Sequence, residues 1–210
     1  MKRQIAMMTV AAALALFTSL PRHASAEERP VAKSRTSVKK PIAKDVGQPS
    51  HLYYDGKQKR RILLDETLVA EFGEAPSAVR SAHPGALVEK VNGGATVYRV
   101  QAGSYKSVGD AAPQGAVSPV FHEGGTAAGR LMALPGGVLV NFKADWNTAR
   151  VNAWAAAKGL VVDKKLAIGE NWYVIKSAPG LASLDLANQI HLSGEVVSAM
   201  PDWWMEISTR

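Results

Sequence analysis

The side chains that most often carry catalysis or hold metal ions are few in this sequence, and they lie far apart. The chain has no cysteine, and no two of its five histidines lie at metal-ligand spacing. These histidines are His23, His51, His83, His122 and His191. The nearest approach to a reactive cluster is His122 with Glu123, followed by two glycines. A loop after a strand is the simpler interpretation of that segment.

Other catalytic patterns are also missing from the sequence. The adjacent acids Asp65 and Glu66 would point to opposite faces of a strand and could not converge on one substrate. There is no G-x-S-x-G segment, no phosphate-binding glycine loop and no H-E-x-x-H helix. We therefore expect that the protein is not an enzyme and has no catalytic residue, no metal and no cofactor.

Large aromatic side chains near the C-terminus are the most unusual feature of the sequence. Trp203 and Trp204 follow the last predicted strand, and Trp172 and Tyr173 lie on a strand expected in the same sheet. These rings either close the core of their own domain or anchor a partner, because Trp and Tyr are enriched at binding hot spots. Residues 205–210 contain no Pro or Gly and can lie extended, although such an end is often frayed.

The apolar pattern predicts strands and helices in an order that occurs twice, after a hairpin over residues 53–64. The first copy comprises a strand at 67–72, a helix at 75–82, strands at 87–91 and 96–100, a short helical or irregular piece at 104–112 and a strand at 116–121. The second copy comprises a strand at 137–143, a helix near 151–157, strands at 160–166 and 172–175, a helix at 181–190 and a strand at 196–201.

The residue types repeat along with the elements. Residues 67–72 match 137–142, and residues 116–119 match 196–199. We therefore predict an α+β protein of two tandem ferredoxin-like βαββαβ lobes, each an antiparallel sheet with two helices on one face. The first lobe, with its N-terminal hairpin, spans 51–130, and the second spans 131–210. The other face of each sheet is left free to pack against something.

Residues 1–26 have the three regions of a secretory signal peptide. Lys2 and Arg3 precede an apolar run over 5–16, and Ala24-Ser25-Ala26 offers a cleavage site before Glu27. The apolar run is shorter than the roughly 20 residues that span a bilayer, so we expect no transmembrane segment. The sequence therefore predicts export, to the periplasm or to the extracellular medium.

Residues 27–50 are predicted to be a disordered basic linker. They are rich in Lys, Pro and Ser and lack apolar periodicity, and their six Lys and Arg against three Asp and Glu give +3 of the +4 that remains once residues 1–26 are removed. The segment is either a plain spacer or an electrostatic contact to an anionic cell surface. The rest of the chain is nearly neutral, and we expect no nucleic-acid binding, because phosphate binding needs a basic face on a folded surface.

Several segments together resemble the N-terminal prodomain of secreted subtilisin-like serine proteases. They are residues 118–125, 137–142 and 172–175, with Pro201-Asp202-Trp203, and the 53–64 hairpin is similar to the start of longer precursors. The resemblance covers about 51–204 and is strongest over 116–204. It implies a βαββαβ unit whose sheet packs on two surface helices of the protease. In that family the unit acts as a folding chaperone and temporary inhibitor, with its C-terminal end in the active-site cleft.

The sequence departs from that family in one respect. The chain stops where a precursor would pass into its catalytic domain, and the three active-site signatures are absent. The resemblance therefore implies a chaperone or inhibitor acting on a separately encoded subtilisin-like protease, with Arg210 nearest the scissile position. The protease-binding residues that it implies are Trp172, Met200, Pro201, Asp202, Trp203, Trp204, Met205, Glu206, Ile207, Ser208, Thr209 and Arg210.

Two other interpretations stay open at this point. An extracytoplasmic module for small-molecule or protein recognition would share the fold, would have a closed pocket between the lobes and would be indifferent to loss of residues 203–210. A truncated, non-catalytic protease precursor would also share the fold but would have no working partner.

Overall fold

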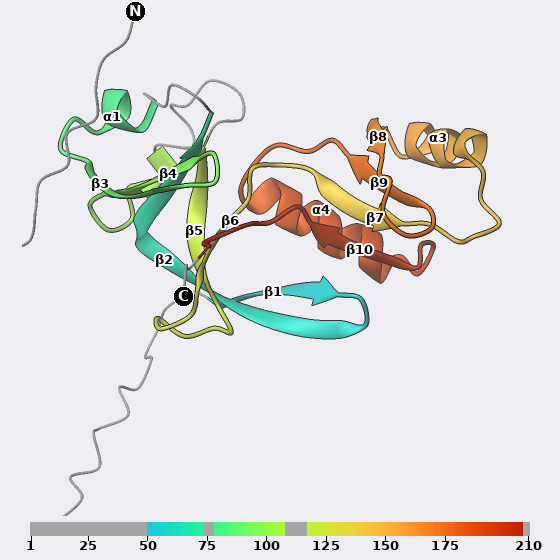
Figure 1. Cartoon of the computed structure of the whole chain (residues 1–210), viewed down its shortest axis with the longest axis horizontal. Coiled ribbons are helices and arrows are strands. Elements are labelled where there is room, and N and C mark those ends of the chain that lie inside the picture. The colour runs from blue at the N-terminus through green and yellow to red at the C-terminus, as the bar shows by residue number, and fades with distance from the viewer. Residues whose placement is uncertain (1–49, 74–77, 108–116, 208–210) are drawn as a thin grey trace, which may run out of the picture. The chain divides into compact units, whose positions relative to one another are not determined.

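The computed structural model of the chain describes residues 50–73, 78–107 and 117–207, which all fall in one compact unit (Figure 1). The predicted signal peptide and all but the last residue of the predicted linker lie outside the described residues. The same holds for the start of the predicted 75–82 helix, for most of the 104–112 piece and for residues 208–210. Within the described ranges, no helix is long and apolar enough to cross a membrane.

The fold is α+β with two antiparallel sheets, which confirms the predicted class. The strands of the first sheet are β1 (Ser50–Asp55), β2 (Gln58–Phe72), β3 (Leu87–Asn92), β4 (Ala95–Arg99), β5 (Val117–Glu123), β6 (Leu131–Ala133) and β11 (Trp204–Met205). They lie in the order β11-β6-β5-β2-β4-β3, and β1 also pairs with β2. The second sheet has the order β10-β7-β9-β8, from β7 (Val138–Asn141), β8 (Val162–Lys165), β9 (Trp172–Ile175) and β10 (Ser198–Pro201).

Helices α3 (Thr148–Ala157) and α4 (Leu181–Leu192) accompany the second sheet, and the short helix α1 (Ala78–Ala82) accompanies the first. The start of α3 is set by Asn147, whose side chain accepts a hydrogen bond from the Arg150 backbone N–H at 2.9 Å. Gly159, with a φ of +66°, follows its end. The apolar side chains of α3 and α4 pack on one face of the sheet, around Phe142 and Tyr173.

The first sheet curls until its two outer strands meet through side chains. β11 and β3 stand at opposite ends of the strand order, yet Lys90 of β3 forms an ion pair with Glu206, just after β11. Asn92 donates its side-chain N–H to the carbonyl of Ile207 at 3.1 Å, and its own carbonyl accepts from Nε1 of Trp204 at 3.1 Å. These contacts close the curled sheet on the side where no backbone ladder joins it.

Trp204 fills the inner face of this curled sheet. It is 9% exposed and packs with Leu68, Val97 and Val120, while small side chains from β2, β4 and β6 leave room for the indole ring. A Cβ atom at Gly93 would lie 3.2 Å from the Trp204 Nε1 atom, so the turn between β3 and β4 follows the ring closely. The first sheet therefore has no free inner face, in contrast to the expectation from sequence.

Two segments that were assigned by sequence to the second lobe belong to the first sheet. β6 pairs with β5, and β11 pairs with β6 through Trp204 opposite Ala133 and Met205 opposite Met132. Figure 1 shows the chain running from β10 of the second sheet directly to this edge. Strands of two or three residues carry no periodic pattern, so the sequence indicated an extended tail but not its partner.

The predicted N-terminal hairpin is confirmed, and it contacts the second sheet. Gly56, with a φ of +58°, forms the turn between β1 and β2. β1 lies beside β10 and α4, where Asn188 donates to the Leu52 carbonyl at 2.8 Å and Tyr54 stacks on His191 at 4.2 Å between ring centroids. The hairpin therefore links the two sheets within the compact unit.

If Trp204 closes the first sheet, Trp204→Ala should destabilise the protein by about 3–5 kcal/mol, because it removes a buried ring and leaves a cavity. Urea unfolding of the purified chain measures this change. The control is Ile207→Ala, since Ile207 is 66% exposed and its contact to Asn92 uses only the backbone. Equal losses in the two variants would show that Trp204 does not hold the sheet.

Candidate protein-docking face

The second sheet has one face covered by helices and one that is not. Along β7, Val138 and Val140 point into the core with α3 and α4, so Leu139 points to the opposite face. Cross-strand register places Met200 and Val174 on either side of Leu139. Figure 1 shows α4 behind β7 and β10, so this opposite face is turned toward the viewer.

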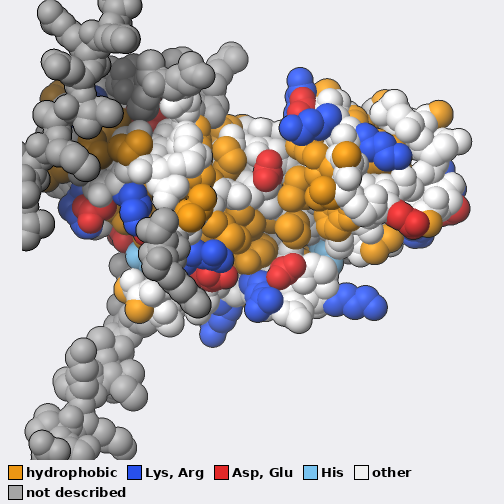
Figure 2. Space-filling model, in the orientation of Figure 1, with side chains coloured by type: hydrophobic (Ala, Val, Ile, Leu, Met, Phe, Trp, Pro, Cys, Tyr) orange, Lys and Arg blue, Asp and Glu red, His pale blue; other side chains and the backbone are white. Residues whose placement is uncertain are grey.

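We call this surface the open face and define it by five residues: Leu139, Lys164, Trp172, Val174 and Met200. Lys164 is paired with Val174 and extends the row to β8, while Trp172 is the cross-strand partner of Asn141 in the neighbouring row. Leu139, Trp172 and Met200 are partly exposed, and Lys164 is exposed. Figure 2 shows hydrophobic side chains gathered over this part of the molecule. The open face is therefore an apolar strip with a cation at its edge.

A hollow of about 290 Å³ lies at one end of the open face. Its lining includes Gly137, Lys164, Val174 and Asp202. A Cβ atom at Gly137 would lie 3.3 Å from Val174 Cγ1 and 3.7 Å from Asp202 Cβ, and its φ is +87°, so glycine keeps this end open. The hollow therefore extends the apolar strip and adds polar groups at this end.

Asp202 brings a partly buried carboxyl group into that hollow. Burial raises its pKa above the ordinary range, and the positive charge of Lys164 opposes the shift in part. Within the described part of the chain, its side chain has no hydrogen bond or ion pair. A partner that supplied a donor or a cation here would therefore relieve an unfavourable burial.

The structure separates the site residues that the sequence predicted into two groups. Trp172 and Met200 lie on the open face, Asp202 lies in the adjoining hollow, and Pro201 is buried in β10. The residues that follow turn away to the first sheet, namely Trp203, Trp204, Met205, Glu206 and Ile207. Ser208, Thr209 and Arg210 lie outside the described residues.

Trp203 and Trp204 pack in the core of their own chain. The Trp203 ring lies against Tyr53 at 5.1 Å and Phe121 at 5.9 Å between centroids. Its buried Nε1 atom has no acceptor in the described part of the chain. In this conformation, these two rings therefore close the core of their own chain, which is the first of the two roles considered from the sequence.

Sequence reasoning did not single out Leu139, Val174 or Lys164. A signal was present, because residues 138–140 are all apolar instead of alternating with polar residues. Such a run indicates a strand with apolar contacts on both faces. It could have pointed to a second surface on β7 before the structure was known.

His122, the residue nearest to a reactive cluster in the sequence, lies in β5 and has both ring nitrogens engaged. Nε2 is 2.9 Å from Oδ2 of Asp65, and Nδ1 is 3.1 Å from the Gly129 carbonyl. Oδ1 of Asp65 accepts from the backbone N–H and the hydroxyl of Thr67, at 2.9 and 2.7 Å. This pair joins β5 to the bulge in β2, and neither ring nitrogen is open to a substrate.

Among the residues that the structure describes, no three His, Asp or Glu side chains gather as a possible metal site. Comparisons of the chain with protein-family models, with curated proteins and with solved structures found no match. The open face and its hollow are therefore argued from their own geometry.

The Asp65–His122 pair should make stability depend on pH at the acid side. Burial alone would raise the pKa of Asp65, but hydrogen bonds from His122 and Thr67 outweigh it and lower the pKa. The stabilisation is therefore present above the ordinary pKa of aspartate and is lost as pH falls through the lowered value. We expect Asp65→Asn to lose roughly 1–3 kcal/mol at neutral pH and much less in acid, by urea unfolding. An equal loss at every pH would contradict this assignment.

Asp202 should make stability depend on pH in the opposite direction to Asp65. Because its pKa is raised in the folded state, its burial is unfavourable above that raised value and harmless below the ordinary pKa of aspartate. We therefore expect Asp202→Asn to raise the melting temperature at neutral pH, with a gain that vanishes in acid. The matched control is Asp185→Asn, at an exposed position on α4. A lower melting temperature for Asp202→Asn at neutral pH would show that the carboxylate is favourably held.

Proposed function

We propose that this protein is an exported, prodomain-like chaperone and inhibitor that binds a separately encoded subtilisin-like serine protease. The observation that carries the proposal is the open face, an apolar surface on a sheet whose other face is covered by α3 and α4. The class of partner is supported by the resemblance of residues 116–204 to the prodomains of such proteases. Export is supported by the signal-peptide pattern of residues 1–26.

We also infer that both sheets follow the ferredoxin-like plan. The second sheet is built from β7, α3, β8, β9, α4 and β10, with the first strand between the last and the third. Within the first sheet, β5-β2-β4-β3 repeats that strand order. In this interpretation, β1, β6 and β11 are additions to the first copy, and β6 and β11 cover the face that the second copy leaves open.

The size of the open face limits what it can do alone. Four strands spaced about 4.8 Å apart, each four residues long, give a face of roughly 20 by 14 Å. A stable protein complex buries about 800 Å² on each partner, which is well above that area. The protease would therefore also contact the hollow at Asp202 and surfaces beside the sheet.

The C-terminal segment would supply the inhibitory part of the mechanism. An extended segment can add a strand to the edge of a substrate cleft through main-chain hydrogen bonds. In the described conformation residues 204–207 are bound to the first sheet, so cleft insertion requires β11 to leave β6. Binding only the folded protease would also stabilise it by mass action, which is the chaperone activity.

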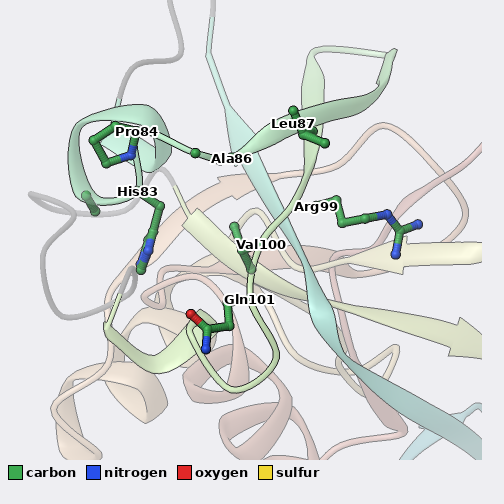
Figure 3. Close-up of a pocket in the computed structure, with 9 residues that line it drawn as sticks. His83, Pro84, Ala86, Leu87, Arg99, Val100 and Gln101 are labelled. Atoms are coloured by element: carbon green, nitrogen blue, oxygen red, sulfur yellow. The ribbon is translucent and has the colours of Figure 1, made fainter.

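A binding module for small molecules is the second candidate function, and two hollows in the structure favour it. One of about 480 Å³ lies at the start of β3, but in Figure 3 the side chain of Arg99 points away from it. Arg99 is instead ion-paired with Glu89. Another, of about 430 Å³, is lined by Trp146 and Trp154 beside α3. Each of these hollows lies against one sheet, whereas a module of this kind was expected to bind between the lobes.

Capture of the partner tests the proposal. We expect the chain from Glu27 to Arg210 to retain a serine protease from the exported fraction of the host and to inhibit it. Met200→Lys places a charge on the open face and should weaken capture and inhibition at least tenfold, because a buried unpaired charge is costly. The control is Leu192→Lys, since Leu192 is 67% exposed on α4. Equal capture by both variants would exclude the open face as the docking surface.

A chain that ends at Asp202 separates inhibition from docking. If the C-terminal segment enters the cleft, this shortened chain should bind the protease more weakly and should not inhibit it. A thermal melt of the shortened chain shows whether the first sheet stays folded. Full inhibition by a folded shortened chain would assign inhibition to the open face and would remove any role for residues 203–210.

A further inference from the structure

Residues 204–207 occupy a defined slot on the first sheet. The slot is formed by the edge of β6 and by Lys90 and Asn92, which lie at the end of β3. The backbone of residue 206 donates to the Leu131 carbonyl at 2.9 Å, and Oε2 of Glu206 accepts from the Leu131 N–H at 3.3 Å. With the β11–β6 pairing, these bonds satisfy the exposed edge of β6. We call this surface the strand slot.

The strand slot recognises side chains as well as backbone. Its inner end takes the Trp204 ring, with Nε1 bonded to the Asn92 carbonyl. Two positions further on, Lys90 takes the carboxylate of Glu206. Between them, Met205 packs against the buried cluster that includes Phe121 and Met132. The slot therefore fits an extended segment that carries a tryptophan, an apolar residue and then an acid. None of these contacts depends on the covalent link at Asp202.

Two polar groups in the link between the second sheet and the strand slot lack hydrogen-bond partners in the described residues. The link consists of Asp202 and Trp203, between the end of β10 and the start of β11. The Asp202 carboxyl is partly buried without a hydrogen-bond partner in the described residues, and the Trp203 Nε1 atom is buried without an acceptor there. Opening this link would hydrate both polar groups, which favours departure of β11, while the slot contacts and the packing of the Trp203 ring on Tyr53 and Phe121 oppose it.

We propose that the strand slot is a binding site for this C-terminal segment in trans, and that residues 204–207 of a second copy of the chain occupy it by strand exchange. A second copy fits because it offers the same tryptophan and acid to the same slot. Exchange keeps every slot contact and hydrates the two unpaired polar groups of the link in both copies. The inference is independent of the proposed protease partner.

Concentration decides which copy fills the slot. A short link gives the chain's own segment an effective concentration of about the millimolar range. The native chain should therefore be a monomer at micromolar concentration and should exchange only when its own segment is disfavoured. Charge reversal at the Lys90–Glu206 pair provides that bias.

The first experiment mixes two charge-reversed chains. In K90E, the slot and the chain's own segment both carry negative charge; in E206K, both carry positive charge. In a mixture, each slot meets the opposite charge on the segment of the other chain. After brief incubation in mild denaturant and its removal, native mass spectrometry should show a heterodimer at least tenfold above either homodimer. The double variant K90E/E206K should be monomeric, like the native chain. A mixture that stays monomeric would overturn the proposal.

The second experiment uses a peptide and does not depend on charge reversal. A fluorescent peptide with the sequence of residues 203–210 is added to the chain that ends at Asp202, during refolding. We expect binding and a raised melting temperature, and we expect the W204A peptide to do neither. If the folded shortened chain binds neither peptide, the slot is not a site in trans. If the peptide binds but the charge-reversed chains do not pair, exchange between copies is wrong. If the shortened chain does not fold, the mixture alone decides.

Discussion

The packing of one C-terminal tryptophan inside the first sheet determines how the rest of the structure is arranged. Trp204 is the largest side chain of the cluster on the inner face, and it holds the outer strands close enough for Lys90 and Glu206 to pair. A buried aromatic ring contributes several kcal/mol, which is a large part of the 5–15 kcal/mol that stabilises a typical domain. Because this ring follows β10 after only two residues, a short link joins the two sheets there, in addition to residues 134–137 between β6 and β7 and to the contacts of the N-terminal hairpin.

That constraint explains why the two sheets differ in what they offer to a partner. In the first sheet, β6, β11 and the tryptophan fill the face that a simple βαββαβ unit would leave uncovered. The second sheet has no equivalent additions in the described residues, and its open face keeps Leu139, Trp172 and Met200 partly exposed. The repeated strand order therefore leads to two outcomes, a self-closed sheet and a sheet with an available surface. The proposed protease contact follows from the second outcome, and the strand slot follows from the first.

Local signals in the sequence predicted the elements well and their long-range partners poorly. Gly56 in the first hairpin and Asn147 before α3 are short-range signals, and the structure has a turn and a helix start at those positions. The α+β class with antiparallel sheets followed from the order of such elements. The pairing of β11 with β6 joins residues about 70 positions apart and involves two residues of β11, so no periodic pattern could reveal it.

The candidate site was predicted in part for the same reasons. Trp172, Met200 and Asp202 were selected through the resemblance to protease prodomains, and they lie on or beside the open face. Leu139 and Val174 were missed because an apolar strand residue is commonly assigned to the core, and only the helix positions show which face is covered. The role of residues 203–207 toward a protease stays a prediction, because the structure shows them bound to their own chain.

The central claim is that the partner covers the open face, and site-specific labelling tests it most directly. The chain has no native cysteine, so Lys164→Cys on the open face and Leu192→Cys on α4 each give a single reactive thiol at an exposed position. Maleimide labelling rates are compared with and without the captured protease. We predict that the protease slows labelling at position 164 at least tenfold and leaves position 192 unchanged. Slowed labelling at 192 with an unchanged rate at 164 would contradict the account.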